Sequence, residues 1–329
     1  MDAEDTTIVA MLREALRSAY DVQPVALTRL IGTEGDKPVY LAMLPDATRW
    51  VVRVYMPANT RSDIAATARV LIALEEADYP AERLVHTVDD APFAARDGWR
   101  LLVTRFVAGM PVSRDLPTLT RLGALLGRLH AQFEAAPLLE ALPISERSIA
   151  QEMSLALDDL ASIAGRVPPQ LQPLYAALLA AIDATQHWTD LPATLIHSDF
   201  HPGNVLALPD GTLTVIDWDG AGTCPAILDL GFLLGSCHPE HGDKPDAAQI
   251  DALIAGYGQH HRLTQPELDG LFDAIRFRPL TFLAAELPQM VAAPGWRSPN
   301  YDWWFARYAA SAETALLARA AFERVAWQG

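Results

Sequence analysis

The sequence predicts a two-lobed α+β fold, with a small N-terminal lobe built on a mixed β-sheet and a larger, mainly helical C-terminal lobe. β-type segments separated by turn residues dominate the first third of the chain, and apolar residues at helical spacing dominate the rest. A length of 329 residues suits two such lobes and is too long for one small core. We expect residues 1–107 to form the first lobe and residues 108–329 the second, with a cleft between them.

The first lobe is expected to begin with an amphipathic helix at 5–20, where Ile8, Leu12 and Leu16 share one face. Three β segments, a helix and two further β segments follow, separated by Gly-containing and Pro-Asp turns. Their predicted ranges are 25–31, 39–44 and 50–55 for the first strands, 62–77 for the helix, and 84–88 and 101–107 for the last strands.

Helical spacing dominates the second lobe and is interrupted by one insert of short strands. The predicted helices cover 119–133, 149–164, 171–188 and most of 226–327, with breaks near 239–245 and 294–299. The insert has strands at 194–197, 205–208 and 212–217. Asp210-Gly211 lies between the last two apolar runs and predicts a hairpin there.

The composition limits the classes of partner. The formal net charge of −16 would repel nucleic acid and anionic membranes and would favour a cationic small substrate, although solubility alone is a simpler explanation. The chain has no apolar run near the roughly 20 residues that span a bilayer, and its acidic N-terminus does not resemble an export signal. Cys224 and Cys237 belong to no zinc or disulfide pattern. These features favour a cytoplasmic enzyme, and they leave its oligomeric state open.

Three polar side chains follow apolar strands in the second lobe. Four residues separate Asp199 from Asn204, which is the spacing of the base and the metal ligand in a kinase catalytic loop. Asp217 follows the predicted hairpin, where a second metal-binding carboxylate would lie. Phosphoryl transfer needs a base for the attacking hydroxyl and oxygen ligands for Mg²⁺. The pattern therefore predicts a phosphotransferase.

Two stretches, HSDFHPGNVL at 197–206 and VIDWDGAG at 215–222, resemble the aminoglycoside phosphotransferase and choline kinase-like family, which has a protein-kinase-like fold. Weaker similarity covers 50–57, 101–109 and 122–131. The resemblance implies transfer of the γ-phosphoryl group of ATP or GTP to a hydroxyl of a small molecule, such as an aminoglycoside or a related antibiotic or metabolite. The identity of the acceptor stays open.

Carried over to this chain, the resemblance makes Asp199 the catalytic base and gives Mg²⁺ to Asn204 and Asp217. His197 and Asp229 would position the catalytic loop. A metal site formed by His197, Asp199 and His201 is an alternative. It leaves the spacing of Asn204 and Asp217 unexplained.

In the first lobe the resemblance places the adenine-binding hinge from Thr104 to Phe106 and the phosphate-binding cation at Arg53. The family usually has Lys at this position, paired with a Glu on the next helix, although some antibiotic kinases resemble this sequence in carrying Arg. Alignment puts Thr67 where the Glu is expected, about two turns before Glu75-Glu76. Either the alignment slips or the ion pair is absent.

Several other features have two interpretations. The turn from Gly32 to Lys37 either approaches phosphate or is a solvated loop. Aromatic residues at 296–308 are typical of helix packing, although they could line a substrate pocket. Glu286 and Glu313 could bind a cationic acceptor, and Asp219 has no assigned role. Because of Arg53 and the missing helix Glu, a nucleotide-binding, pseudokinase-like regulatory module without turnover is the competing function.

Overall fold

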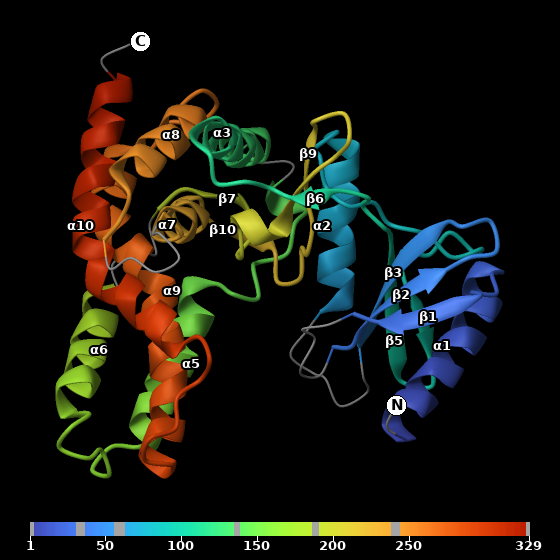
Figure 1. The fold of residues 1–329 in the computed structure, drawn as a ribbon, viewed down its shortest axis with the longest axis horizontal. Helices are drawn as coiled ribbons and strands as arrows, with labels where there is room; N and C mark the ends of the chain where they lie inside the picture. The colour runs from blue at the N-terminus through green and yellow to red at the C-terminus, as the bar shows by residue number, and fades with distance from the viewer. Residues whose placement is uncertain are drawn as a thin grey trace. The chain divides into compact units, whose positions relative to one another are not determined.

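The structure, a computed structural model, describes residues 3–30, 37–55, 63–134, 139–185, 191–237 and 244–326. The chain forms two compact units, each described here by itself. Unit 1 comprises Met1–Pro111 and Val205–Gly220, and unit 2 comprises Val112–Asn204 and Ala221–Gly329. Unit 1 contains a sheet and unit 2 is mainly helical, which confirms the α+β prediction (Figure 1).

Unit 1 is built on a five-stranded sheet in the order β1-β2-β3-β5-β4, and every strand pair in it is antiparallel. Its elements are α1 (Ala3–Tyr20), β1 (Ala26–Arg29), β2 (Val39–Met43), β3 (Arg49–Tyr55), α2 (Ile64–Glu76), β4 (Ala94–Arg96) and β5 (Trp99–Arg105).

Helix α1 covers one face of this sheet (Figure 1). Its buried residues Leu12 and Leu16 share a core with Val52 of β3 and Val103 of β5, which are opposite each other in the sheet register. Because side chains alternate across a strand, the next residue along each strand, Arg53 or Thr104, projects from the other face. The strand period thus places two predicted nucleotide-binding residues side by side, away from the apolar core.

The predicted strand at 84–88 does not form, and β4 forms at Ala94–Arg96 instead. Leu84 makes only an isolated bridge to Thr104, and the N–H of Val85 donates to the Val103 carbonyl at 2.9 Å. Val88 is exposed, so the end of this segment lacks the burial that stabilises a strand.

A second, three-stranded sheet has the order β6-β8-β9, from β6 (Met110–Pro111), β8 (Val205–Ala207) and β9 (Leu213–Val215). The predicted hairpin at 205–217 is present as β8 and β9. It packs with unit 1, although it belongs to the range predicted for the second lobe. The hairpin is attached to unit 1 through Val215. This residue forms a β-bridge with Ala81, and the Val215 carbonyl accepts from the N–H of Glu82 at 3.1 Å.

Unit 2 surrounds the long helix α9, which packs against α5, α6, α7 and α10. Its elements are α3 (Leu116–Gln132), α5 (Ile149–Ser162), α6 (Gln172–Thr185), β7 (Ala193–Ile196), the 3₁₀ turn Pro202–Asn204, β10 (Gly222–Pro225), α7 (Ile227–Gly235), α8 (Ala247–Tyr257), α9 (Gln265–Ala292) and α10 (Tyr301–Ala326). Strand β7 pairs with β10, which the sequence patterns did not predict.

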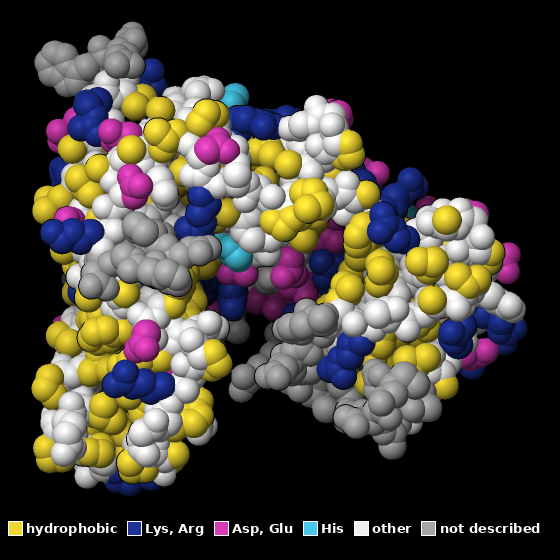
Figure 2. Space-filling view, viewed as in Figure 1, with side chains coloured by type: hydrophobic (Ala, Val, Ile, Leu, Met, Phe, Trp, Pro, Cys, Tyr) yellow, Lys and Arg dark blue, Asp and Glu magenta, His cyan; other side chains and the backbone are white. Residues whose placement is uncertain are grey.

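The surface of the described residues is mixed in character. On the face of unit 2 that Figure 2 draws, Lys and Arg side chains are interspersed with Asp and Glu and with apolar side chains. Among the described helices, none combines the length and hydrophobicity needed to cross a membrane.

Helices α3 and α8 approach each other closely at three glycines, Gly123, Gly127 and Gly256. A Cβ on Gly256 would lie 1.8 Å from the Thr120 carbonyl oxygen, and one on Gly123 would lie 1.9 Å from the Leu253 carbonyl oxygen. Both obstacles are backbone atoms, so a side-chain rotation cannot remove the clash.

We expect Gly256→Ala to lower the free energy of unfolding by about 1–3 kcal/mol, because the helices must move apart. Denaturant unfolding of the purified variant measures this. Gly235→Ala is the matched control: this residue is also helical, and its Cβ would lie 4.0 Å from the Ile275 carbonyl oxygen, an ordinary van der Waals distance. The control should be neutral or slightly more stable. Equal stability of the two variants would contradict the close packing.

Candidate active site

The loop after β7 is held from beneath by a buried carboxylate. Asp229, in the first turn of α7, accepts the backbone N–H of His197 at 2.6 Å and that of Ser198 at 2.8 Å. Asp229 and His197 are both buried, and Phe200 anchors the loop in the core. Hydrogen bonds from two consecutive backbone groups to one carboxylate fix the path of the chain, because neither group has an alternative partner in water. Asp229 therefore has the positioning contacts predicted from the sequence.

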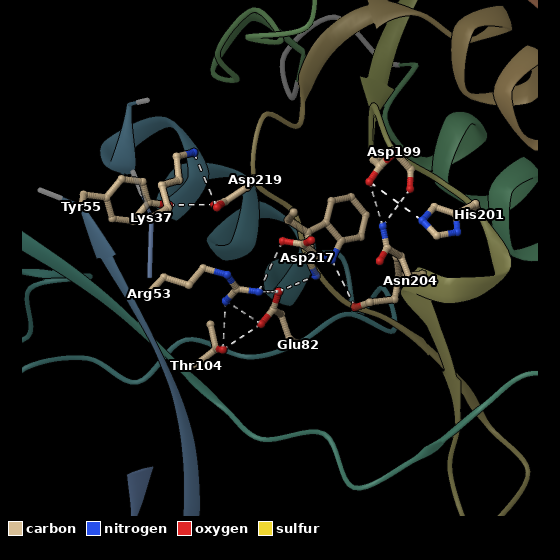
Figure 3. Close-up of polar contacts among 12 residues, drawn as sticks. Lys37, Arg53, Tyr55, Glu82, Thr104, Asp199, His201, Asn204, Asp217 and Asp219 are labelled. Carbon is tan, nitrogen blue, oxygen red and sulfur yellow. Dashed lines mark hydrogen bonds and ion pairs between the residues drawn. The ribbon is translucent and has the colours of Figure 1, made fainter. Parts of the chain in front are cut away.

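Asp199 lies on this loop with 34% of its side chain exposed. Its backbone N–H donates to Nδ1 of His197 at 3.2 Å. The amide nitrogen of Asn204 donates to the Asp199 carbonyl at 3.0 Å and to its Oδ2 at 3.2 Å (Figure 3). The amide oxygen of Asn204 thus remains as an acceptor toward a ligand. The structure brings together Asp199 and Asn204 as predicted neighbours, with the carboxylate accessible to an incoming hydroxyl.

Two arginines, which sequence reasoning missed, lie close to Asp199. Arg278 of α9 donates to the Ser198 carbonyl at 2.6 Å and lies 3.3 Å from Glu152 of α5. Nη1 of Arg147 lies 3.8 Å from Oδ1 of Asp199. Burial, and then the charge of Arg147, lower the pKa of Arg278 to about 10. Arg278 lies 80 positions after Ser198 in the sequence, so no local pattern could have identified this contact.

In unit 1, Arg53 forms a buried, two-pronged ion pair with Glu82 (Figure 3). Nη1 of Arg53 lies 3.0 Å from Oε2 and Nη2 lies 2.9 Å from Oε1. The Thr104 hydroxyl donates to Oε2 at 2.7 Å. Burial lowers the pKa of Arg53, but the charges of Glu82, Asp219 and Asp217 outweigh it and raise the pKa overall. Arg53 therefore stays charged.

Glu82 resolves the question of the missing acidic partner. It lies in the loop after α2, not on the helix itself, which carries Thr67 and Glu75-Glu76. Its signal in the sequence was weak: a single acid between the buried apolar residues Ala81 and Leu84. A buried acid needs a partner, which could have suggested a pairing with Arg53.

Asp217 joins the same network through its backbone. Its N–H donates to Oε1 of Glu82 at 2.9 Å, and its carboxylate oxygen lies 3.8 Å from Nη2 of Arg53. The side chain is 52% exposed. A φ of 67° puts Asp217 in the left-handed region, an uncommon backbone that surrounding contacts must hold in place. The following residue, Trp218, is fully buried and supplies part of that support.

Asp219 has two partners in unit 1. The Tyr55 hydroxyl donates to Oδ1 of Asp219 at 2.7 Å, and Nζ of Lys37 lies 3.6 Å from Oδ2 (Figure 3). Burial, followed by the charge of Asp219, raises the pKa of Tyr55 well above its usual value. Gly32 and Gly35 of the predicted phosphate turn lie outside the described residues.

The predicted hinge segment is largely engaged within unit 1. Thr104 pairs with Val51 in the sheet, and its hydroxyl belongs to the Arg53–Glu82 network. The N–H of Phe106 donates to the Arg49 carbonyl at 3.0 Å, and the guanidinium of Arg49 lies 4.1 Å from the centre of the Phe106 ring. A backbone donor for adenine is therefore better sought after Phe106 than within 104–106.

The aromatic residues of α10 pack mainly against other rings. Trp304 stacks on Phe282 of α9 at 4.6 Å between ring centres and on Phe232 of α7 at 6.2 Å. Glu286 is buried and accepts from the Ser298 hydroxyl. The side chains at this end of α9 and α10 thus belong mostly to the packing between helices.

Comparisons with other proteins agree with this architecture. The chain is 28% identical over 211 residues to a homoserine kinase from Bradyrhizobium sp. (strain BTAi1 / ATCC BAA-1182). The aligned region covers 63% of this chain and 62% of the length of that relative. Solved structures with a similar fold include the amicoumacin kinase hAmiN in complex with AMP-PNP, Ca²⁺ and Ami, with a TM-score of 0.71 and 16% identity, covering 95% of this chain and 96% of that one.

Spectinomycin phosphotransferase in complex with ADP and spectinomycin is also similar, with a TM-score of 0.68 and 16% identity over 95% of this chain and 98% of that one. At such identities the similarity establishes the fold, which is the predicted kinase-like one. The sequence profile of the phosphotransferase enzyme family matches residues 28–270. This match extends over most of the chain and includes Arg53, Glu82, Asp199, Asn204 and Asp217. The chain therefore belongs to the phosphotransferase enzyme family.

Proposed function

We propose that this protein is a small-molecule kinase that transfers the γ-phosphoryl group of ATP to a hydroxyl, with Asp199 as the general base. The observation that carries the proposal is the Asp199 loop. Its carboxylate is accessible, while Asp229 and Asn204 hold the loop through hydrogen bonds. A carboxylate fixed in this way accepts a proton from a hydroxyl without first reorganising, which is the requirement for general-base catalysis.

We propose Asn204 and Asp217 as magnesium ligands on the chemistry of their side chains. Mg²⁺ prefers oxygen ligands and usually keeps several waters, so one amide and one carboxylate suffice with the nucleotide. The side-chain nitrogen of Asn204 is turned to Asp199, which leaves its oxygen for the metal. Within the described ranges no group of three or more His, Cys, Asp or Glu side chains is placed to hold a metal, and this two-residue set needs none. A bound Mg²⁺ would neutralise negative charge on the phosphate groups.

We propose that unit 1 binds the nucleotide, which is the role that the sequence predicts for residues 1–107. Arg53 donates to Glu82 with two of its five N–H groups and to the Thr104 hydroxyl with a third, so two remain for phosphate oxygens. The Glu82 pair weakens the case for a pseudokinase, which depended on an absent ion pair. We propose ATP as the donor, with GTP as the alternative, because the similar solved structures hold AMP-PNP or ADP. We also propose a cytoplasmic location, which agrees with the buried thiols of Cys224 and Cys237 being outside any disulfide.

The relatives suggest where to look for the acceptor. The sequence relatives are named homoserine kinases, and the solved structures include antibiotic kinases. An ADP-release screen over hydroxy amino acids, amino alcohols and hydroxylated antibiotics, with Mg²⁺ and either ATP or GTP, tests the proposal. Phosphoryl transfer to one acceptor class is the expected result. Nucleotide binding without transfer to any acceptor would favour the regulatory module.

Removal of either proposed metal ligand should change the magnesium dependence. We expect Asn204→Ala and Asp217→Asn each to raise the Mg²⁺ concentration at half-maximal activity by at least about tenfold, because even indirect metal partners contribute that much. Titration of Mg²⁺ into the chelator-treated enzyme measures this. Asp210→Asn is a control in the same hairpin, since Asp210 is an exposed turn residue that accepts the Thr212 N–H. An unchanged magnesium dependence in both variants would exclude this site.

A further inference from the structure

The two arginines beside Asp199 differ in how far their donors are already used. Arg278 has only 11% of its side chain exposed, and it contacts the Ser198 carbonyl and Glu152. Arg147 has 43% of its side chain exposed. Its nearest ion-pair partners are Glu152 at 3.9 Å and Asp199 at 3.8 Å, both beyond hydrogen-bonding distance. Arg147 therefore has guanidinium donors available to a ligand, whereas Arg278 is part of the framework.

Arg147 places one partly exposed positive charge beside Asp199, in a protein whose net charge is negative. The net charge is −16, which by itself would favour a cationic acceptor. A cation bound at Asp199, however, would meet the guanidinium of Arg147, which lies 3.8 Å from the same carboxylate. Charges that close dominate over the distant, screened charges of the surface. A negative group on the acceptor would instead find an oppositely charged partner in Arg147.

We infer that Arg147 binds a carboxylate of the acceptor, and that the acceptor is a small hydroxy acid or hydroxy amino acid. This inference rests on the proposed function of Asp199. The planar guanidinium matches a carboxylate with two parallel hydrogen bonds, and it is weakly hydrated. Arg147 and Asp199 are neighbours, so the carboxylate and the reacting hydroxyl lie only a few bonds apart, at about 1.5 Å per C–C bond.

A pair of acceptors that differ only in charge tests the inference. L-homoserine and its carboxamide, together with other small hydroxy acids and their carboxamides, are compared by ADP release. We expect the wild type to favour the acid by at least about tenfold in kcat/KM, since a hydrogen bond to a charged group is worth that much. Arg147→Gln should lose this preference, mainly through KM for the acid, with KM for ATP unchanged. Arg147→Lys keeps the positive charge but lacks the planar guanidinium. Its preference for the acid should therefore lie between that of the wild type and that of Arg147→Gln.

Arg319→Gln is the matched control, because Arg319 of α10 is 48% exposed and pairs with Asp269 away from Asp199. Equal losses on the acid and the amide, or a raised KM for ATP, would show that Arg147 serves the nucleotide and would overturn the inference. Turnover of antibiotics or amino alcohols alone would also overturn it and leave the proposed function standing. No turnover of any acceptor by the wild type would overturn the proposed function itself.

Discussion

Asp199→Asn is expected to lower kcat by about a thousandfold while leaving nucleotide affinity close to that of the wild type. The amide keeps the size and an oxygen of the carboxylate, so it can still accept from Asn204, but it cannot take a proton from the acceptor. General-base catalysis typically contributes a factor of this size. Steady-state kinetics with a saturating acceptor, and calorimetric titration with ADP, measure the two quantities separately.

Asp183→Asn provides the comparison, because Asp183 is an exposed residue of α6 in the same unit. This control should keep full activity. A residual kcat within tenfold of the wild type in Asp199→Asn would remove Asp199 as the base. A loss of ADP binding along with kcat would show instead that the substitution disturbs the loop, whose backbone is tied to His197 and Asp229.

Glu82→Leu should produce the largest loss of stability, about 3–5 kcal/mol in the free energy of unfolding. The substitution leaves the buried guanidinium of Arg53 without its two-pronged partner, and it also removes acceptors used by the Thr104 hydroxyl and the Asp217 N–H. Leaving one buried charge without its partner costs more free energy of folding than the intact ion pair contributes. Denaturant unfolding of the variant measures the loss.

The double variant Arg53→Met with Glu82→Leu separates folding from phosphate binding. Stability should recover in large part, because neither buried charge remains. The KM for ATP should stay at least about tenfold above that of the wild type, since a hydrogen bond to a phosphate oxygen is lost. Glu14→Gln removes an exposed partner of Arg96 in the same unit and should change little. A normal KM for ATP in the double variant would limit Arg53 to a structural role.

The sequence was informative where function depends on residues close together in the chain. The five-residue step from Asp199 to Asn204 and the hairpin before Asp217 were both legible, because a loop and a two-stranded turn have fixed local geometry. The strand period likewise anticipated β3 and β5. The roles of these residues stay predictions, whereas the family and the fold are now established.

The sequence was uninformative where contacts join distant segments or depend on tertiary packing. The acidic partner of Arg53 was expected on helix α2, whereas Glu82 lies in the loop that follows this helix. Arg147 and Arg278 meet near Asp199 only because α5 and α9 pack together. Strand β10 is short and forms by pairing with β7, a stabilisation that no local propensity reveals.

The interleaving of the two units has a consequence for how the protein is made. Unit 1 takes its last segment from Val205–Gly220, so it stays incomplete until residue 220 has left the ribosome. Until then the loop after α2 lacks the bridge from Ala81 to Val215, and Glu82 lacks the Asp217 N–H. N-terminal domains usually fold first during synthesis. Unit 1 cannot do so, because part of it is translated after most of the first half of unit 2. A fragment ending at residue 111 should accordingly be a substrate for chaperones rather than a free-standing domain.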